Sequence, residues 1–195
     1  MKYDPEKHHR RSTRLGGYDY AQPGAYFVTV CTRGRACLFG HVLNREMRLN
    51  EAGEIARRCW EDIPTHFPMV ELGAFTIMPN HMHGIVVIGC KGEASDFHVS
   101  ANTRAGMSDA SPLRSRHSHN GTQPGSLSAI VQNFKSVSTR RINAIRRAPG
   151  THVWLRDYYE HVVRNEQELT AIREYILGNP ARWDDDENNP DFMAQ

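Results

Sequence analysis

The sequence lacks any long apolar run, and its first twenty residues contain no apolar core of the kind found in signal peptides. A membrane-spanning helix needs about 20 predominantly apolar residues, so we expect a soluble protein that works in the cytoplasm and has no membrane partner. Cysteine is also scarce. The four cysteines form no C-x-x-C pair, which argues against a disulfide framework or a zinc ribbon.

A marked excess of charge of one sign is absent as well. The 24 Lys and Arg residues and 22 Asp and Glu residues give a net charge of +2, which is too small to indicate a polyanionic partner by itself. Charge is uneven along the chain, however, and 195 residues suit one domain with additions. We expect a basic amino-terminal extension at 1–20, one domain at 21–183 and an acidic tail at 184–195.

Residue types and hydrophobic periodicity predict an order of strand, helix, strand, strand, helix, strand, helix. The strands are expected at 25–32, 70–78, 82–89 and 152–156, and the helices from Asn50 to about Pro64, at 127–147 and at 166–178. This order predicts an α+β domain with a ferredoxin-like (RRM-like) antiparallel sheet and helices packed on one face. Residues 91–124 have no sustained period, so we expect a flexible insertion there.

The most informative motif is His81-Met82-His83, at the start of an apolar strand. Residues two apart on a strand point to the same face, so both imidazoles can meet one metal ion or one phosphate. Chance adjacency with ordinary packing explains an isolated H-x-H equally well in a chain with 11 histidines. Polar side chains at the mouth of an apolar strand need partners, and this favours a functional site.

A further metal ligand has to come from another element, because two imidazoles leave a divalent ion under-coordinated. Tyr175 and Asn179 are four residues apart in the third predicted helix, so they share one helical face. Tyr175 is the one tyrosine of seven within a predicted helix. The alternative is a packing tyrosine at the shoulder of an amphipathic helix.

Four ordered motifs resemble those of single-tyrosine HUH transposases, and most closely the REP-associated tyrosine transposases. They are YFVTV at 26–30, MPNHMHG at 78–84, YYEHVVRN at 158–165 and YILGNP at 175–180. The resemblance covers residues 15–183 without the 91–124 insertion, and this insertion and the basic amino terminus depart from the family's pattern.

The resemblance implies an HUH endonuclease fold and an enzyme that cleaves and rejoins single-stranded DNA beside hairpins through a covalent 5′-phosphotyrosine. His81 and His83 match the metal-binding histidines, Tyr175 matches the nucleophile, and Asn179 matches the polar residue that completes the metal site. The implied ion is Mg²⁺ or Mn²⁺, the implied partners are single-stranded, hairpin or palindromic DNA elements, and the chain is expected to act as a monomer or homodimer.

Other basic residues are weaker candidates for DNA contact, and solvated or structural side chains explain them equally well: Lys135, Arg140, Arg141, His161 and Arg164. Two other functions remain open at this point. One is a non-catalytic module that binds single-stranded nucleic acid on an aromatic sheet surface. The other is a zinc hydrolase, which is disfavoured because neither an obvious acidic ligand nor a glutamate at metalloprotease spacing accompanies the histidines.

Overall fold

The computed structural model describes residues 18–89 and 122–190, so most of the predicted extension and insertion, and the end of the predicted tail, lie outside the described residues. The elements in chain order are β1 (Gly24–Cys31), η1 (Arg33–Arg35), β2 (Gly40–Leu43), β3 (Glu46–Leu49), α1 (Glu51–Glu61), α2 (Ile63–His66), β4 (Val70–Ile77), β5 (His81–Ile88), α3 (Leu127–Arg146), β6 (Tyr159–Val163), α4 (Glu166–Gly178) and η2 (Pro180–Asp185). None of the described helices is long and apolar enough to cross a bilayer.

The main sheet has four antiparallel strands in the order β4-β5-β1-β6. With α1 between β1 and β4 and α3 between β5 and β6, this is the predicted ferredoxin-like arrangement, and the α+β fold is confirmed. β5 lies in the interior of the sheet, as its apolar residues on both faces predicted. β4 and β5 form the predicted hairpin.

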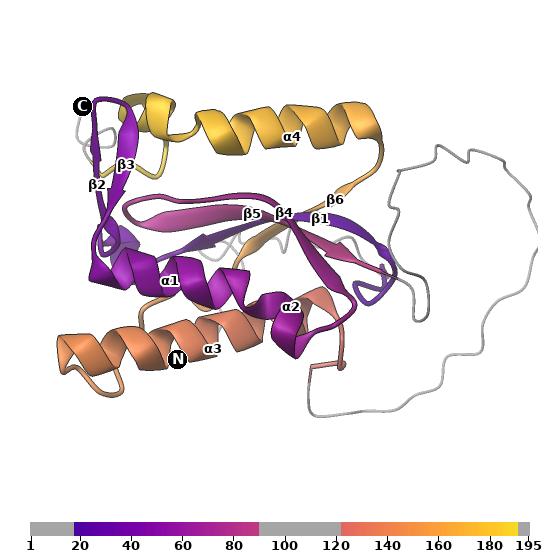
Figure 1. Cartoon of the computed structure of the whole chain (residues 1–195), viewed down its shortest axis with the longest axis horizontal. Coiled ribbons are helices and arrows are strands. Elements are labelled where there is room, and N and C mark those ends of the chain that lie inside the picture. Colours follow the sequence, from indigo (N-terminus) through magenta and orange to yellow (C-terminus); the bar gives the residue numbers. More distant parts are fainter. Residues whose placement is uncertain (1–17, 90–121, 191–195) are drawn as a thin grey trace, which may run out of the picture.

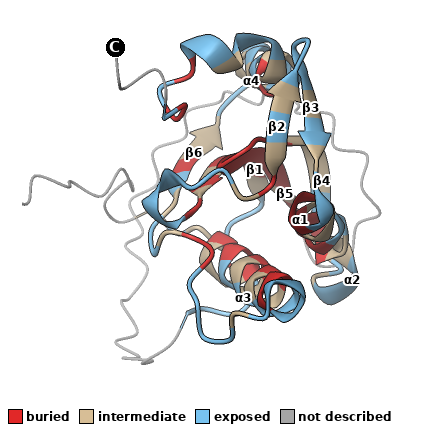
Figure 2. Cartoon of the chain, turned by 90° about the vertical axis from the view of Figure 1, so that its left-hand side faces the viewer, coloured by how far each residue is buried: buried red, intermediate tan, exposed pale blue. Residues whose placement is uncertain are grey.

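Helices cover both faces of this sheet. The predicted packing of helices on one face is correct for α1 and α3, which bury Val28 and Val30 of β1. α4 lies over the opposite face, where its Leu169 and Ile176 pack against Phe27 (Figure 1). The physical reason is that the sheet is apolar on both sides, so the second side also needs cover. Figure 2 shows the buried positions of α1 and α3 facing the sheet.

The strand predicted at 152–156 is wrong. In that segment Trp154 forms a single bridge with Thr32, and the fourth strand is β6, which pairs with β1 farther along the chain. Beyond this bridge, the Lys135 ammonium donates hydrogen bonds to the carbonyl groups of Leu155 and Arg156 (2.5 and 2.8 Å). These carbonyls are therefore held by a side chain of α3 rather than by a neighbouring strand.

A second, two-stranded sheet of β2 and β3 was not predicted. Its turn residues Asn44 and Arg45 both have positive φ angles, of 53° and 64°. Turns of this kind are usually signalled by Asn-Gly or Asp-Gly. Because arginine stands at the second position in place of glycine, the residue types of this turn did not predict a hairpin.

Helix starts, in contrast, follow their local signals. The Asn50 side chain accepts a hydrogen bond from the Gly53 amide at the start of α1, and the Asn165 side chain accepts one from the Glu168 amide at the start of α4. α1 then packs closely on β5, because a Cβ atom at Gly84 would lie 2.4 Å from Cζ2 of Trp60. The glycine thus lets the helix approach the strand that carries the histidine pair.

Candidate metal and tyrosine site

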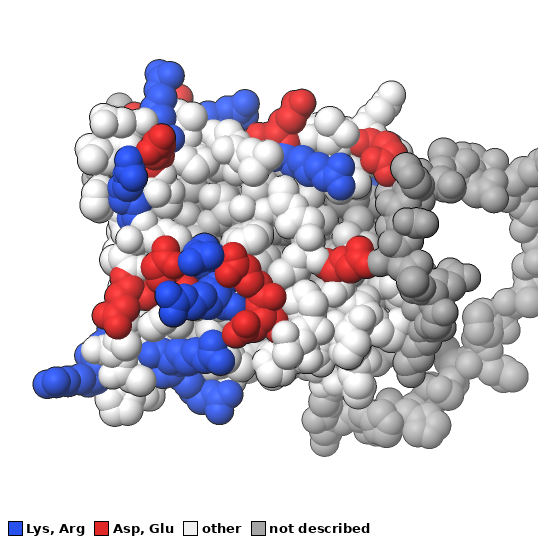
Figure 3. Space-filling view, in the orientation of Figure 1, with Lys and Arg blue, Asp and Glu red and all other residues white. Residues whose placement is uncertain are grey.

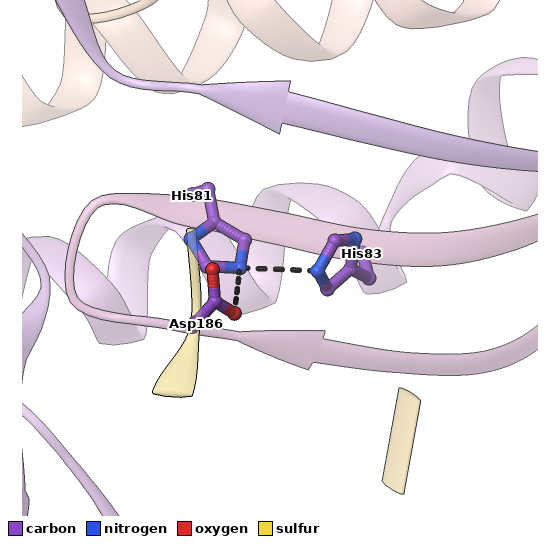
Figure 4. Close-up of side chains that lie close together, drawn as sticks. All are labelled: His81, His83 and Asp186. Atoms are coloured by element: carbon purple, nitrogen blue, oxygen red, sulfur yellow. Dashed lines mark hydrogen bonds and ion pairs between the residues drawn. The ribbon is translucent and has the colours of Figure 1, made fainter. Parts of the chain in front are cut away.

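The histidine pair lies at the start of β5, on the face covered by α4. In the strand register His81 is opposite Cys31 and His83 is opposite Thr29. Met82 points to the other face and belongs to the core under α1 and α3. Both histidine side chains are buried, and their Nε2 atoms lie 3.1 Å apart (Figure 4). The alternation along one strand therefore places both rings in one site, as the motif predicted.

The amide of Asn80 determines the tautomer of His81. The Asn80 Nδ2 group donates to the carbonyls of Arg35 and Asn188, at 3.0 and 2.6 Å, so its Oδ1 faces Nδ1 of His81 at 2.9 Å. An amide oxygen is only an acceptor. Nδ1 of His81 therefore carries the proton, and a neutral His81 has its lone pair on Nε2, directed into the site.

His83 is held between a hydroxyl and an aromatic ring. Its Nδ1 lies 2.8 Å from Oγ1 of Thr29, and its ring stacks on Phe27 with centroids 5.5 Å apart. These contacts leave Nε2 directed at His81. Partners of this kind fix the orientation of imidazole ligands in metal sites.

Burial makes both histidines neutral at physiological pH. It lowers the pKa of His81 to about 4, although the Asp186 carboxylate and the Asn179 amide act in the opposite direction. It lowers the pKa of His83 to about 2, with a further contribution from His81. Neutral imidazole is the form that binds metal ions. Neither histidine therefore has to release a proton to the solvent before a cation binds.

Asp186 is a third candidate ligand, and sequence analysis missed it. Its Oδ2 atom lies 3.8 Å from Nε2 of His81 (Figure 4), and the three potential ligand atoms of His81, His83 and Asp186 all lie within 4.8 Å of one another. Its Oδ1 atom accepts hydrogen bonds from the backbone and side-chain amides of Asn188, at 2.7 and 3.0 Å. The carboxylate is therefore buried and held in one orientation.

The run of acidic residues around Asp186 concealed it, because such a run usually forms a solvated surface. The signal against that interpretation is the Asn188-Asn189-Pro190 sequence, which is typical of a turn that brings the chain back. In the structure Asn189 donates to the carbonyl of Trp183, and the Trp183 ring stacks on His81 at 6.1 Å. This turn places Asp186 in the site.

Asn179 is buried beside the same cluster, at the end of α4. Its Nδ2 group donates to Oδ2 of Asp186 at 3.3 Å, whereas its Oδ1 atom is buried without a hydrogen-bond partner among the described residues. A buried carbonyl without a partner costs free energy, and amide and carboxylate oxygens are ligands that Mg²⁺ and Mn²⁺ prefer. Two imidazole nitrogens and two oxygens thus fit a divalent cation.

Tyr175 reaches the histidine pair from α4. Its hydroxyl lies 3.4 Å from Nε2 of His83, and its ring makes an edge contact with Phe27. Burial raises the pKa of the phenol, as do the nearby Asp186 and Glu187, whereas Arg182 and Asn179 act in the opposite direction. The side chain is still 39% exposed, so the phenol is open to solvent on one side and touches the candidate metal site on the other.

Three of the five weaker DNA-contact candidates are not brought to this site. Lys135, Arg140 and Arg141 lie on α3, beyond the opposite face of the sheet. Arg141 forms an ion pair with Asp62 at 3.3 Å, and burial lowers the pKa of Lys135. Figure 3 shows Lys and Arg side chains gathered over the carboxyl-terminal half of α3, with acidic groups interspersed above them.

The other two, His161 and Arg164, lie on the α4 side. Nε2 of His161 is 2.6 Å from the Glu168 carboxylate, and this carboxylate also accepts a hydrogen bond from the backbone amide of Arg164. Both contacts tie the end of β6 to the first turn of α4. A stabilising role in positioning α4 is therefore visible for His161, and the Arg164 side chain is exposed.

The fold is similar to that of a protein of known structure. The chain is similar in structure to a REP-associated tyrosine transposase that was solved with a bound REP hairpin. The TM-score is 0.55 and the sequence identity is 18%, and the match covers 88% of this chain and 74% of the transposase chain. The fold expected from the HUH resemblance is thereby confirmed. A protein of Haemophilus influenzae strain Rd, described as uncharacterised, is 39% identical over 191 residues, which cover 95% of this chain and 96% of that protein. The chain belongs to the same family as this Haemophilus protein. No protein-family model matches the chain.

Proposed function

We propose that this protein is a metal-dependent endonuclease and strand transferase for single-stranded DNA, with Tyr175 as its nucleophile. The observation that carries the proposal is the position of the Tyr175 hydroxyl, 3.4 Å from Nε2 of His83. A half-exposed phenol in contact with a buried group of metal-ligand type is an arrangement that suits attack on a phosphodiester.

His81 and His83 would hold the cation through their Nε2 atoms, and the oxygens of Asn179 and Asp186 would complete the site on the protein side. The oxygen ligands favour Mg²⁺ or Mn²⁺. When bound, such an ion neutralises charge on a phosphate oxygen and orients the phosphorus for in-line attack.

The tyrosine and its neighbours supply the remaining chemistry. The Tyr175 oxygen forms a bond to phosphorus while the bond from phosphorus to the 3′ oxygen breaks. The phenol loses its proton and the departing 3′ oxygen gains one, so the products are a 5′-phosphotyrosine and a free 3′-hydroxyl. The positive charge of Arg182 favours the phenolate, since it lowers the pKa of Tyr175 against the effect of burial.

Rejoining is the reverse of cleavage. The 3′-hydroxyl of the same or another strand attacks the phosphotyrosine, the phosphodiester re-forms, and the Tyr175 oxygen leaves. Because the covalent intermediate retains the energy of the broken bond, no ATP is needed. The implied substrate is single-stranded DNA beside a hairpin. In support, the solved REP-associated transposase of the same fold was bound to a REP hairpin.

A direct test is to incubate the protein with labelled single-stranded hairpin DNA from the flanks of its own gene. We expect a covalent protein-DNA species and a shortened strand on a denaturing gel with Mg²⁺ or Mn²⁺, and neither with EDTA. Binding without any covalent species in either metal would instead support the non-catalytic module.

A further inference from the structure

An exposed aromatic side chain lies on the same face of the sheet as the histidines but outside the metal site. Tyr159 opens β6 and is 43% exposed. In the strand register Thr29 is opposite Tyr159 on one side and opposite His83 on the other. Directly opposite residues of antiparallel strands point to the same face. Tyr159, Thr29 and His83 therefore form one row across β6, β1 and β5.

Phe27 connects Tyr159 to the candidate nucleophile. Its ring makes edge contacts with Tyr159 and with Tyr175, each with centroids 6.1 Å apart, and it stacks on His83. The Tyr159 and Tyr175 rings are thus separated by a single aromatic ring. A base within a few nucleotides of a phosphate at Tyr175 can reach the Tyr159 ring.

Tyr159 lies on the edge strand of the sheet, with its side chain exposed. β6 is an edge strand of the four-stranded sheet, and within residues 18–89 and 122–190 no other strand pairs with its outer side. The Phe27 ring supports Tyr159 from the protein side. A supported ring with an exposed surface is the type of side chain on which bases of single strands stack.

We propose that Tyr159 stacks on an unpaired base close to the phosphate that Tyr175 attacks, and so selects single-stranded DNA. This inference rests on the proposed function and names a contact of its substrate. A base inside a duplex has both faces covered by its neighbours, whereas an unpaired base has a free face for the tyrosine ring. The stacking contact therefore favours a single-stranded segment without reading its sequence.

The test measures binding apart from cleavage, in the full-length chain carrying Tyr175→Phe. On this background Tyr159→Ala should weaken binding of the single-stranded hairpin substrate about 10-fold, and Tyr159→Phe, which keeps the ring, should bind within about twofold of the parent. Leu43→Ala is the matched control, since Leu43 is also an exposed apolar side chain but lies on β2. It should not change the affinity.

Single abasic positions near the cleavage site identify the stacked base. At one position, removal of the base should weaken binding to the Tyr159 protein about 10-fold and leave binding to the Tyr159→Ala variant unchanged. Equal affinity of the Tyr159 and Tyr159→Ala proteins would overturn the inference, as would an equal loss in Tyr159→Phe, which would indicate a hydrogen bond of the hydroxyl. An absence of DNA binding would overturn it too. If these binding results hold but the protein with Tyr175 intact forms no covalent adduct, only the proposed cleavage is overturned.

Discussion

His81 and His83 direct their Nε2 atoms at each other across 3.1 Å, and only the first of the two rings has a fixed tautomer. The Asn80 amide forces the proton of His81 onto Nδ1. The partner of His83 is the Thr29 hydroxyl, which can donate or accept a hydrogen bond. His83 can therefore keep a proton on Nε2 and donate it to His81, or move it to Nδ1 and offer its lone pair to a cation. The pair thus suits both a metal-free and a metal-bound site.

The metal site gives the first prediction. Asp186→Asn removes a negative charge while keeping the shape of the side chain, so we expect Mn²⁺ to bind about 10- to 100-fold more weakly. Titration calorimetry with Mn²⁺ measures the effect. Asp184→Asn is the control, because Asp184 is exposed on η2. Equal affinities of the Asp186→Asn variant and the unchanged protein would remove Asp186 from the set of ligands.

The nucleophile gives the second prediction. Tyr175→Phe keeps the ring that contacts Phe27 but lacks the attacking oxygen, so it should form no covalent adduct with hairpin DNA and still bind it. A denaturing gel and a binding titration measure the two properties. Tyr158→Phe is the control, since the hydroxyl of Tyr158 contacts Ser128 of α3 on the other side of the sheet, and it should form the adduct normally. Adduct formation by Tyr175→Phe would show that another nucleophile acts.

The third prediction concerns stability in acid. Histidine has a pKa near 6.5 in an unfolded chain, whereas burial lowers the pKa of His81 to about 4 in the folded protein. The unfolded state therefore binds more protons below pH 6.5, and the free energy of unfolding should fall between about pH 6.5 and pH 4. The slope per buried histidine is about 1.4 kcal/mol per pH unit.

Urea denaturation in the absence of metal, at intervals from pH 8 to pH 5, measures this slope. His83→Gln should reduce it, because one of the two buried imidazoles is lost. His152→Gln replaces an exposed histidine and is the control. Stability that stays constant over this range would contradict the burial of neutral imidazoles in the site.

The fourth prediction tests the packing under the site. In Gly84→Ala the new methyl group would overlap the Trp60 indole, so we expect a loss of about 1 to 3 kcal/mol in the free energy of unfolding. Chemical denaturation measures the loss. Ser136→Ala on the exposed side of α3 is the control and should change stability by less than about 0.5 kcal/mol. An unchanged Gly84→Ala protein would mean that α1 does not pack closely on β5.

The elements with local signals were predictable from the sequence alone. α1 and α4 begin after their Asn caps, and the apolar periods of α3 and α4 give their ends within one residue. α1 ends at Glu61 instead of near Pro64, and a separate short helix, α2, follows it. The H-x-H alternation places His81 and His83 on one face of β5, and the spacing of Tyr175 and Asn179 places them on one side of α4. Hydrogen bonds and contacts between residues close in the chain produce these features, so a short window of sequence contains the information.

Features that depend on distant parts of the chain were decided by the tertiary structure. The segment 152–156 makes one bridge with the end of β1, whereas Tyr159–Val163 pairs with β1 along its length and forms the fourth strand. α4 covers the face opposite α1 and α3, and this brings Tyr175 to His83. Asp186 joins the histidines only because a turn at Asn188 folds an acidic segment back onto β5. Each of these outcomes depends on contacts between residues far apart in the sequence, for which local periodicity carries no signal.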